Sequence, residues 1–589
     1  MKDAEGNPNW PQRRERLLNR LRARRAALGR PARGFATRPE PRTIGNAPRG
    51  RQLAAGTLVH SGHHMETGGR ALWDLDMPTP RFEAGLHGFG WLDDLAAFGD
   101  GAARKCAQDW TWDWIARFGR GAGAGWAPDL VGRRLIRWGG HAAFLLKGRT
   151  PAGREAFFRA MTTQTRFLRR RWQAAPPGLP RFEALAGLIC AGLALEGQER
   201  CALPAIRALS RECDMRIDAE GGVITRNPEE LLEIFTLLIW AAQAQLDAGH
   251  KPEAALEGAV QRIAPVLRAL RHADGALTRF HGGGRGQAGR LDQALAACGI
   301  RPGAQPEMAM GYARLAAGRT TLLIDAAPPP SGAASVNAHA STLAFEMTSA
   351  RRPVVINCGP GTGFGETWRR AGRATPSQST LGIDGLSSSR LGLIGRGRRD
   401  EILYDLPGDV RTHRSTEGGV QHILLGHDGY VSTHGLTHVR QLSLSGDGRV
   451  LRGEDSLGAL SETDQERFAR HLAGSQAAPA GLPFSIRFHL HPDAEAVPDG
   501  DGGGVSITLL SGEVWRFRHE GSAELSLEPS VYLEAGRLKP RATQQIVLAG
   551  RVVEPVCQID WTLAKAEDTP QAIRDILRDD DEHLRDEET

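Results

Sequence analysis

The spacing of hydrophobic residues along this chain changes once, near residue 305. From about residue 50 to 300, apolar residues recur three and four positions apart, as in "FEALAGLICAGLALEG" (182–197), which predicts buried helices. Beyond that point they alternate with polar residues, as in "THVRQLSLSGDGRVLRGEDSL" (437–457), and Gly, Asp and Pro turns separate the runs. The pattern predicts helix–turn–helix units, consistent with a helical array or a toroid, followed by an antiparallel β-sandwich.

The change of period, together with the two charged ends, divides the chain into four segments. Residues 1–45 are predicted to be a basic, partly disordered arm, and residues 46–305 the toroid domain. Residues 306–565 are predicted to form the β-sandwich domain, and residues 566–589 an acidic tail. A chain of 589 residues is too long for one ordinary domain, which agrees with two folded domains between charged ends.

The net charge of +6 is unevenly distributed, because the N-terminal segment is basic and the C-terminal segment is acidic. Nine arginines, interleaved with leucines, lie between Arg13 and Arg33 and form a basic amphipathic arm. Such an arm suits a membrane surface, RNA or an acidic partner, with a solvated leader as the alternative. The C-terminus "RDDDEHLRDEET" is acidic, so the basic charge does not extend over the chain and we expect no nucleic-acid partner.

The cysteines and the N-terminus bear on chemistry and location. Seven scattered cysteines without a Cys-x-x-Cys pair argue against a disulfide framework and against a cysteine-built zinc site. The N-terminal residues contain no apolar core of the kind that a secretory signal needs, and no long uncharged apolar run follows. We therefore expect a cytoplasmic protein, with the periplasm or cell envelope as the alternative.

Two stretches of the β half carry side chains suited to chemistry. "SVNAHASTLAFEM" (335–347) is predicted to be a strand, which would place Asn337, His339 and Ser341 on one face. "WRRAGRATPSQST" (368–380) is predicted to hold its arginines in a turn just before Gln378. Arginine guanidinium groups match carboxylates and sulfates through paired hydrogen bonds, so this turn suits an acidic ligand.

These stretches, with "VVINCG" (354–359) between them, resemble the heparinase II/III-like family of polysaccharide lyases. "THVRQLSL", "IRFHLHP" and "RATQQIVL" in the β half and "LHGFGWLDDLA" in the helical half strengthen the resemblance. It implies an (α/α) toroid followed by a β-sandwich, with a glycan cleft between them. It also implies carbon–oxygen lyase activity, in which a uronic-acid-containing acidic polysaccharide is broken by β-elimination.

β-Elimination needs a group that neutralises the uronate, a base that removes the adjacent proton and an acid for the leaving oxygen. In the family the sandwich motif reads His-x-His-x-Asp, whereas this chain has Asn337, His339 and Ser341. A later family histidine is replaced by Gln378. Some relatives bind zinc nearby, but a neutral amide and a hydroxyl are poor zinc ligands, so we expect no zinc or other cofactor there.

The family's usual tyrosine acid comes from a toroid helix, and this chain has none to offer. All four tyrosines follow residue 305. The corresponding toroid stretch is "RNPEELLEI" (226–234), with Glu230 near the tyrosine position. Asn227 is a predicted N-cap with Pro228 at the first helical position, so Glu230 is interpreted as part of a capping box. A carboxylate acid–base at Glu230 is the alternative.

The resemblance leads to two hypotheses of different classes. As a lyase, the chain would use His339 as the base, with His281 of "TRFHGGGRG" (278–286) as the acid–base group on the toroid side. The remaining polar residues of the site would bind the substrate: Asn337, Arg369, Arg373, Gln378, Arg226 and Arg279. The alternative is a catalytically reduced glycan-binding or envelope-assembly protein on the same scaffold.

Overall fold

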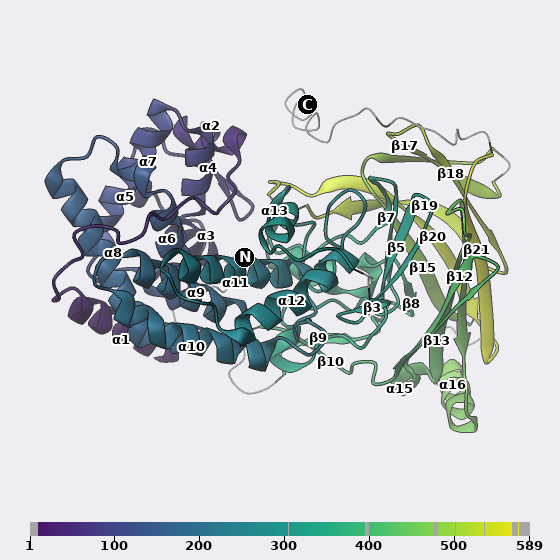
Figure 1. Ribbon diagram of the computed structural model, residues 1–589. Helices are drawn as coiled ribbons and strands as arrows, with labels where there is room; N and C mark the ends of the chain where they lie inside the picture. The colour runs from purple at the N-terminus through teal and green to yellow at the C-terminus, as the bar shows by residue number, and fades with distance from the viewer. Residues whose placement is uncertain are drawn as a thin grey trace. The chain divides into compact units, whose positions relative to one another are not determined.

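The computed structural model describes residues 10–303, 306–394, 400–474, 481–500, 502–534, 536–567 and 575 (Figure 1). The beginning of the predicted arm and most of the predicted acidic tail thus lie outside the described residues. The chain divides into two compact units. The first comprises Met1–Gly221, Glu230–Ala264 and Asp292–Pro302, and the second comprises Gly222–Glu229, Pro265–Leu291 and Gly303–Thr589. The segments that contain Arg226 and His281 therefore belong to the second unit.

The first unit is built from helices, as the three-and-four spacing predicts. Its helices lie in the order α1 (Trp10–Ala26), α2 (Ala47–Ala54), α3 (Pro80–His87), α4 (Gly90–Phe98), α5 (Gly101–Phe118), α6 (Pro128–Gly140), α7 (Ala142–Leu146), α8 (Pro151–Arg171), α9 (Leu179–Ala194) and α10 (Glu199–Arg216). Three further helices are divided between the units: α11 (Pro228–Asp247), α12 (Ala254–Ala269) and α13 (Arg290–Ala297). A short hairpin, β1 (Thr57–His60) and β2 (His63–Glu66), precedes α3. Among the described residues, no helix is both long and apolar enough to span a membrane.

Capping residues and proline set where several helices begin. Each of the Thr79 and Thr150 hydroxyls accepts a hydrogen bond from the backbone N–H three residues later, at 3.1 and 3.2 Å. A proline follows each threonine. Proline suits this position because it lacks the N–H that would have no partner there. α11 begins in the same way, since Asn227 Oδ1 accepts the Glu229 N–H at 3.0 Å. The predicted cap at Asn227 is therefore confirmed.

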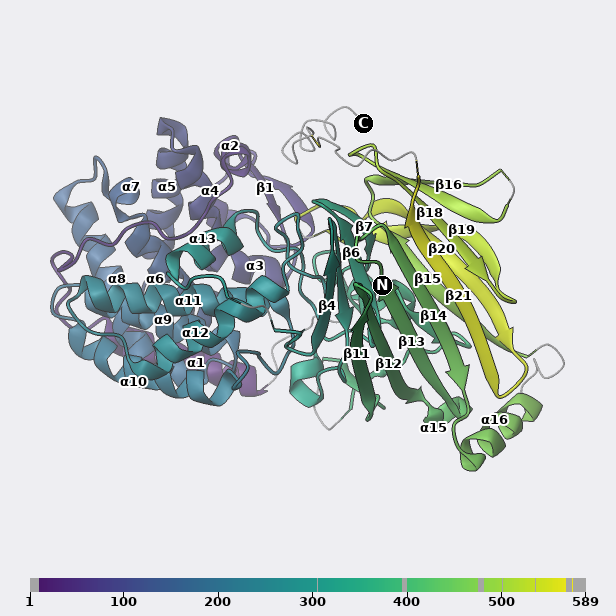
Figure 2. The same cartoon turned by 45° about the vertical axis from the view of Figure 1, so that its right-hand side comes forward.

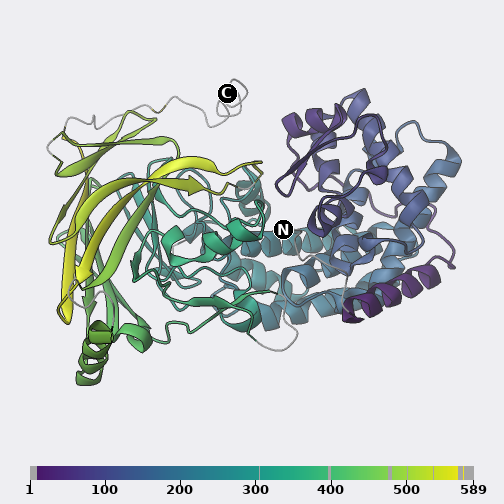
Figure 3. The same cartoon turned by 180° about the vertical axis from the view of Figure 1, so that it is seen from behind.

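Residues 10–26, within the predicted arm, form helix α1, which packs on α8 (Figure 3, purple). Asn19 and Ala23 are buried on its inner face, and Arg171 of α8 donates to Asn19 Oδ1 at 2.8 Å. The outer face keeps Leu17 and Leu21 more than half exposed. It also exposes the arginines Arg13, Arg14, Arg16, Arg20, Arg22, Arg24 and Arg25. The exposed surface of α1 is therefore basic, with two leucines among its arginines.

The second unit contains two large antiparallel sheets (Figure 2). The first has the order β11 (Val410–Glu417), β12 (Val420–Tyr430), β13 (Leu436–Leu444), β14 (Val450–Gly458), β21 (Val556–Lys565), β18 (Val514–Glu520), β17 (Gly504–Leu509) and β16 (Ala494–Pro498). The second has the order β19 (Glu524–Tyr532), β20 (Arg541–Val552), β15 (Leu482–Leu490), β7 (Arg352–Ile356), β6 (Phe345–Ser349), β5 (Thr320–Asp325), β4 (Tyr312–Ala317) and β3 (Met308–Ala309), with β8 (Leu381–Ile383) paired to β15. A small pair, β9 (Arg390–Gly392) and β10 (Ile402–Tyr404), and helices α14 (Glu366–Arg373), α15 (Val431–His434) and α16 (Glu462–Gly474) complete the unit.

One hydrophobic core lies between these two sheets. In β13, every second side chain from Leu436 to Leu444 is buried, as the alternation predicts. Leu442 of the first sheet and Phe488 of the second belong to the same buried cluster. A helical N-terminal region followed by packed antiparallel sheets is the fold class that the sequence indicates, and it is confirmed.

Two local predictions are wrong. The stretch 335–347 is not a continuous strand, because β6 begins only at Phe345. Before it the chain turns, with Leu343 at a φ of 65° and the Ala344 N–H donating to the Ser341 carbonyl at 2.8 Å. The arginines at 369 and 373 do not lie in a turn either, since they belong to helix α14. Turns and short helices depend on tertiary contacts, which cannot be inferred from the spacing of hydrophobic residues along the chain.

Candidate functional site

The two predicted catalytic histidines lie together in the second unit, and each ring accepts a hydrogen bond from the backbone of the other's loop. The His339 N–H donates to His281 Nδ1 at 3.2 Å, and the Gly282 N–H donates to His339 Nε2 at 3.1 Å. Gly282 has a φ of 90°, and a Cβ there would lie 2.7 Å from the Asn337 Cβ, so this close approach requires glycine. Each imidazole therefore uses one ring nitrogen to hold the other loop in place.

Asp325, the last residue of β5, is the centre of this arrangement. Its Oδ2 accepts the Ser341 hydroxyl at 2.6 Å and lies 3.4 Å from His281 Nε2. Its Oδ1 accepts Arg226 Nη2 at 2.6 Å. The Asp325 side chain is fully buried, so its charge is stabilised by these partners and not by water.

Burial and neighbouring charges shift the pKa values of the three ionisable groups at this centre. Burial alone would raise the pKa of Asp325, but Arg226 and His281 outweigh it and hold that pKa below its usual value. Burial lowers the pKa of His281, which Asp325 offsets only in part. Burial, helped by His281 and Arg373, places the pKa of His339 well below its usual value. Both imidazoles are therefore neutral near pH 7, beside an ionised Asp325.

Arg226 links the Asp325 carboxylate to several backbone carbonyls. Its guanidinium donates to the carbonyl oxygens of Met310, Gly311, Ala327 and Pro328 at 2.8–3.0 Å, in addition to Asp325. It also lies over the Tyr312 ring, 4.7 Å from its centroid, and the Tyr312 hydroxyl donates to the Arg226 carbonyl at 2.6 Å. The predicted substrate-binding arginine is thus buried among backbone carbonyls.

Arg279 takes part in a second buried cluster, centred on Glu346 of β6. Glu346 Oε2 accepts the Arg279 N–H at 3.1 Å, the Thr278 hydroxyl at 3.0 Å and His272 Nε2 at 3.1 Å. The Arg279 guanidinium donates to the Tyr532 hydroxyl at 3.0 Å and lies 3.4 Å from Glu346. Burial would raise the pKa of Glu346, but Arg279 and His272 lower it to about 2. The carboxylate is therefore ionised and fixes residues 272–279 to β6.

The other predicted substrate-binding residues hold the loop around His339. Arg373 donates to the carbonyls of Ala338, Ser335 and Glu401 at 2.8–3.1 Å, and it is 1% exposed. Arg369 donates to the Val336 carbonyl at 2.8 Å and to the side chains of Glu366 and Asn337. Gln378 is fully buried and donates to the Gly372 carbonyl at 2.8 Å. Of this group, only Asn337 is exposed.

Glu230 belongs to the first unit, where its side chain is half-buried. Its neighbour Glu229 belongs to the second unit and makes the contact with the glycine-rich segment, because the Gly284 N–H donates to Glu229 Oε2 at 2.8 Å. The structure therefore brings together His281, His339, Asn337, Arg226 and Arg369 in one region of the second unit, and Glu230 is not part of that unit.

The sequence interpretation missed both carboxylates that organise these clusters. Asp325 ends the apolar run "TTLLID", and Glu346 interrupts "LAFEM". An acidic residue inside an otherwise apolar strand is a usable signal, because a buried carboxylate needs cationic or hydrogen-bonding partners. His339 Nε2 already accepts the Gly282 N–H, so it would have to give up that bond to ligate a metal.

The fold is shared with solved structures of heparinases. The crystal structure of heparinase III superposes with a TM-score of 0.65, at 15% identity, over 89% of this chain and 85% of that one. The heparan sulfate lyase HepC from Pedobacter heparinus superposes with a TM-score of 0.53, at 15% identity, over 95% of this chain and 88% of that one. These superpositions establish that the chain shares the fold of the heparinases, and at 15% identity they establish the fold alone.

Sequence comparison gives the family. Residues 302–562 match the model of the heparinase II/III-like C-terminal domain. FtsZ-localized protein C of Caulobacter vibrioides (strain NA1000 / CB15N) is 32% identical over 553 residues, which cover 92% of each chain. This chain belongs to the heparinase II/III-like family, as its sequence motifs indicate.

Proposed function

We propose that this protein is a catalytically silent member of the heparinase II/III-like family that associates with FtsZ. The observation that carries the first part is the burial of both histidines, since His281 is 1% exposed and His339 is 0% exposed. A general base must come within hydrogen-bonding distance of the substrate proton that it removes. Two imidazoles that are enclosed by protein and hold each other's loops do not meet that requirement.

Three of the four tyrosines have hydroxyls that are engaged in internal hydrogen bonds, and the fourth, Tyr404, is exposed on β10. The hydroxyls of Tyr312 and Tyr430 donate to the carbonyls of Arg226 and Leu381, and the Tyr532 hydroxyl accepts from Arg279. A tyrosine acid must instead give its proton to the leaving oxygen of the substrate. The buried arginines donate to backbone carbonyls and internal carboxylates, so they are not directed at a uronate in solvent.

The second part of the proposal rests on FtsZ-localized protein C. Its similarity to this chain extends over 92% of each sequence, so it includes both the helical and the β half. We propose that this chain likewise localises with FtsZ. The exposed basic face of α1 offers a surface for an acidic partner or an anionic membrane.

Polysaccharide binding, with or without lyase activity, is the second candidate function. It is favoured by the match of residues 302–562 to a heparinase II/III-like domain. On this alternative, His339 and His281 would have to become accessible to an acidic glycan. The two functions differ in partner, so they are separated by binding experiments with FtsZ and with acidic polysaccharides.

The experiment that tests the proposed partner uses the full chain and FtsZ from the same organism. Fluorescently labelled versions of both proteins are expected to co-localise in cells, and depletion of FtsZ should disperse the signal of this chain. Purified chain should also be retained on immobilised FtsZ, whereas heparinase III, the matched control for the fold, should pass through. Retention equal to that of heparinase III, together with a distribution unaffected by FtsZ depletion, would contradict the proposal.

A further inference from the structure

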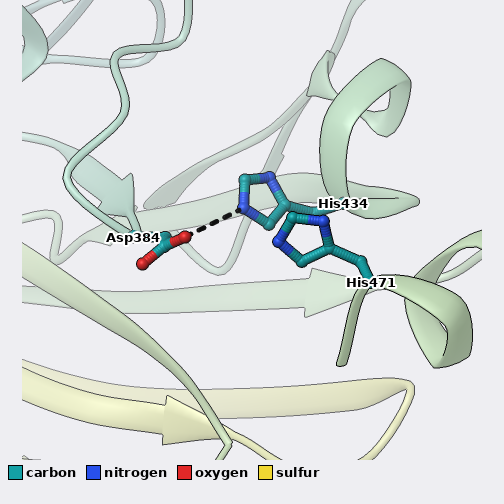
Figure 4. A group of neighbouring side chains, drawn as sticks. All are labelled: Asp384, His434 and His471. Atoms are coloured by element: carbon teal, nitrogen blue, oxygen red, sulfur yellow. Dashed lines mark ion pairs between the residues drawn. The ribbon is translucent and has the colours of Figure 1, made fainter. Parts of the chain in front are cut away.

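Three side chains from distant segments of the second unit form a compact group outside the clusters described above (Figure 4). Asp384 follows β8, His434 is the last residue of α15, and His471 lies on α16. One ligand atom from each residue lies within 4.8 Å of the other two. The two imidazole ring centroids are 4.4 Å apart, and His434 Nε2 is 3.9 Å from Asp384 Oδ2.

The local backbone explains why these side chains converge. Gly435 follows α15 with a φ of 69°, and a Cβ there would lie 2.2 Å from the Asp464 carbonyl oxygen of α16. Only glycine therefore allows α15 to end so close to α16. Phe468 of α16 is buried in the sandwich core, and His471 lies three residues later on the same side of the helix.

Asp384 is held in place by the backbone on the other side of the group. It has a φ of 51°, which aspartate tolerates better than most residues, and its N–H donates to the Pro483 carbonyl at 2.7 Å. Its side chain remains 44% exposed. The carboxylate can therefore adjust its position while the backbone that carries it stays fixed.

The hydrogen bonds of His434 leave one ring nitrogen directed at this group. The Thr433 hydroxyl donates to the Tyr430 carbonyl at 3.3 Å, so its oxygen is left to accept the His434 Nδ1–H at 2.8 Å. His434 Nε2 then carries the lone pair. This nitrogen is buried and has no hydrogen-bond partner among the described residues. Histidines that bind metals use this arrangement, in which the second ring nitrogen donates to a neighbouring oxygen and fixes the ring.

We propose that Asp384, His434 and His471 bind a Zn²⁺ ion, with water as the fourth ligand. Two imidazoles and one carboxylate are ligands that zinc accepts at about 2.0–2.2 Å, whereas calcium and magnesium prefer oxygen ligands alone. Ligand atoms of a tetrahedral site lie about 3.3 Å apart, so the group has to contract slightly around the ion. The exposed Asp384 and the half-buried His471 can make that movement, while the buried His434 stays in place.

This site is separate from the zinc position known in some relatives. By the family resemblance, two of the ligands at that position correspond to His339 and Gln378. Neither residue belongs to the group of Asp384, His434 and His471. The inference also does not depend on the association with FtsZ. Binding of zinc and binding of FtsZ are measured independently, so either can fail alone.

The test is titration of the metal-stripped full-length protein with Zn²⁺ by calorimetry, and with Co²⁺ by visible absorption. We expect one tight equivalent of Zn²⁺, and Co²⁺ bands typical of four-coordinate geometry. His471→Ala and Asp384→Asn should each weaken binding at least about 10-fold, because each removes a ligand. Both side chains are partly exposed, so the metal-free variants should melt at the same temperature as the unsubstituted protein.

Matched controls come from histidines outside this group. His413 on β11 and His64 on β2 are exposed, and His413→Ala and His64→Ala should leave zinc affinity unchanged. The proposal is overturned if the protein binds no tight equivalent. It is equally overturned if His471→Ala and Asp384→Asn bind zinc as tightly as the two control variants.

Discussion

The Asp325→Ala variant is expected to lose about 3–5 kcal/mol of unfolding free energy, the range for breaking a buried ion pair by removing one partner. Arg226 would keep its backbone carbonyls but lose its only carboxylate partner among the described contacts, at 2.6 Å. Ser341 and His281 would also lose the oxygen that they face. Urea denaturation followed by circular dichroism measures the change.

The control for this prediction is Asp409→Ala in the same unit. Asp409 pairs with Arg411 at an exposed position, and exposed pairs contribute little to stability, so no clear change is expected. Asp325→Asn keeps the shape of the side chain and removes its charge, and it should lie between the two alanine variants. If Asp325→Ala is as stable as Asp409→Ala, then Asp325 is not the centre of the arrangement described above.

The Asp455→Ala variant is expected to have a similarly large effect, about 3–5 kcal/mol, in the core of the sandwich. Asp455 accepts His438 Nε2 at 2.8 Å, Arg440 Nε at 2.8 Å and Trp561 Nε1 at 2.9 Å. Arg440 is fully buried, so loss of this carboxylate leaves a cation whose remaining hydrogen-bond partners among the described residues are the backbone carbonyls of Leu343 and Ser379. Thermal unfolding, monitored by tryptophan fluorescence, measures the destabilisation.

A second substitution separates the cost of the unpaired cation from that of the missing side chain. Arg440→Met removes the charge but keeps a long apolar side chain at that position. The double variant Asp455→Ala/Arg440→Met should therefore be more stable than the sum of the two single changes predicts. If the changes in unfolding free energy of the two single variants add up to that of the double variant, the ion pair between Asp455 and Arg440 is not the source of the destabilisation.

Much of the fold could be predicted from the sequence because its signals are local. The alternation in β13 and the cap at Asn227 each involve residues within a few positions of one another, and the structure contains both. The change of period near residue 305 predicted the order of the helical region and the sandwich, and the family motifs agreed with it. The strand predicted over 335–347 failed because Ser341 and Leu343 bind Asp325, a residue outside the motif, and turn the chain.

The organisation of the candidate site was harder to predict. Motifs pointed to His281 and His339, but the residue that organises them, Asp325, lies in an apolar strand 16 positions before Ser341. The group of Asp384, His434 and His471 joins three segments by packing alone, without a short spacing that could reveal it. Arginines suited to an acidic ligand by composition bind backbone carbonyls instead, which only the tertiary structure decides.

The measurement that tests the central claim most directly is release of unsaturated uronate, followed by ultraviolet absorption, from a panel of acidic polysaccharides. Heparinase III serves as the positive control, because it shares the fold. The enclosed His281 and His339 predict no product above background from any polymer at high enzyme concentration. Product formation that disappears in the His339→Ala variant would contradict the account and establish this chain as a lyase.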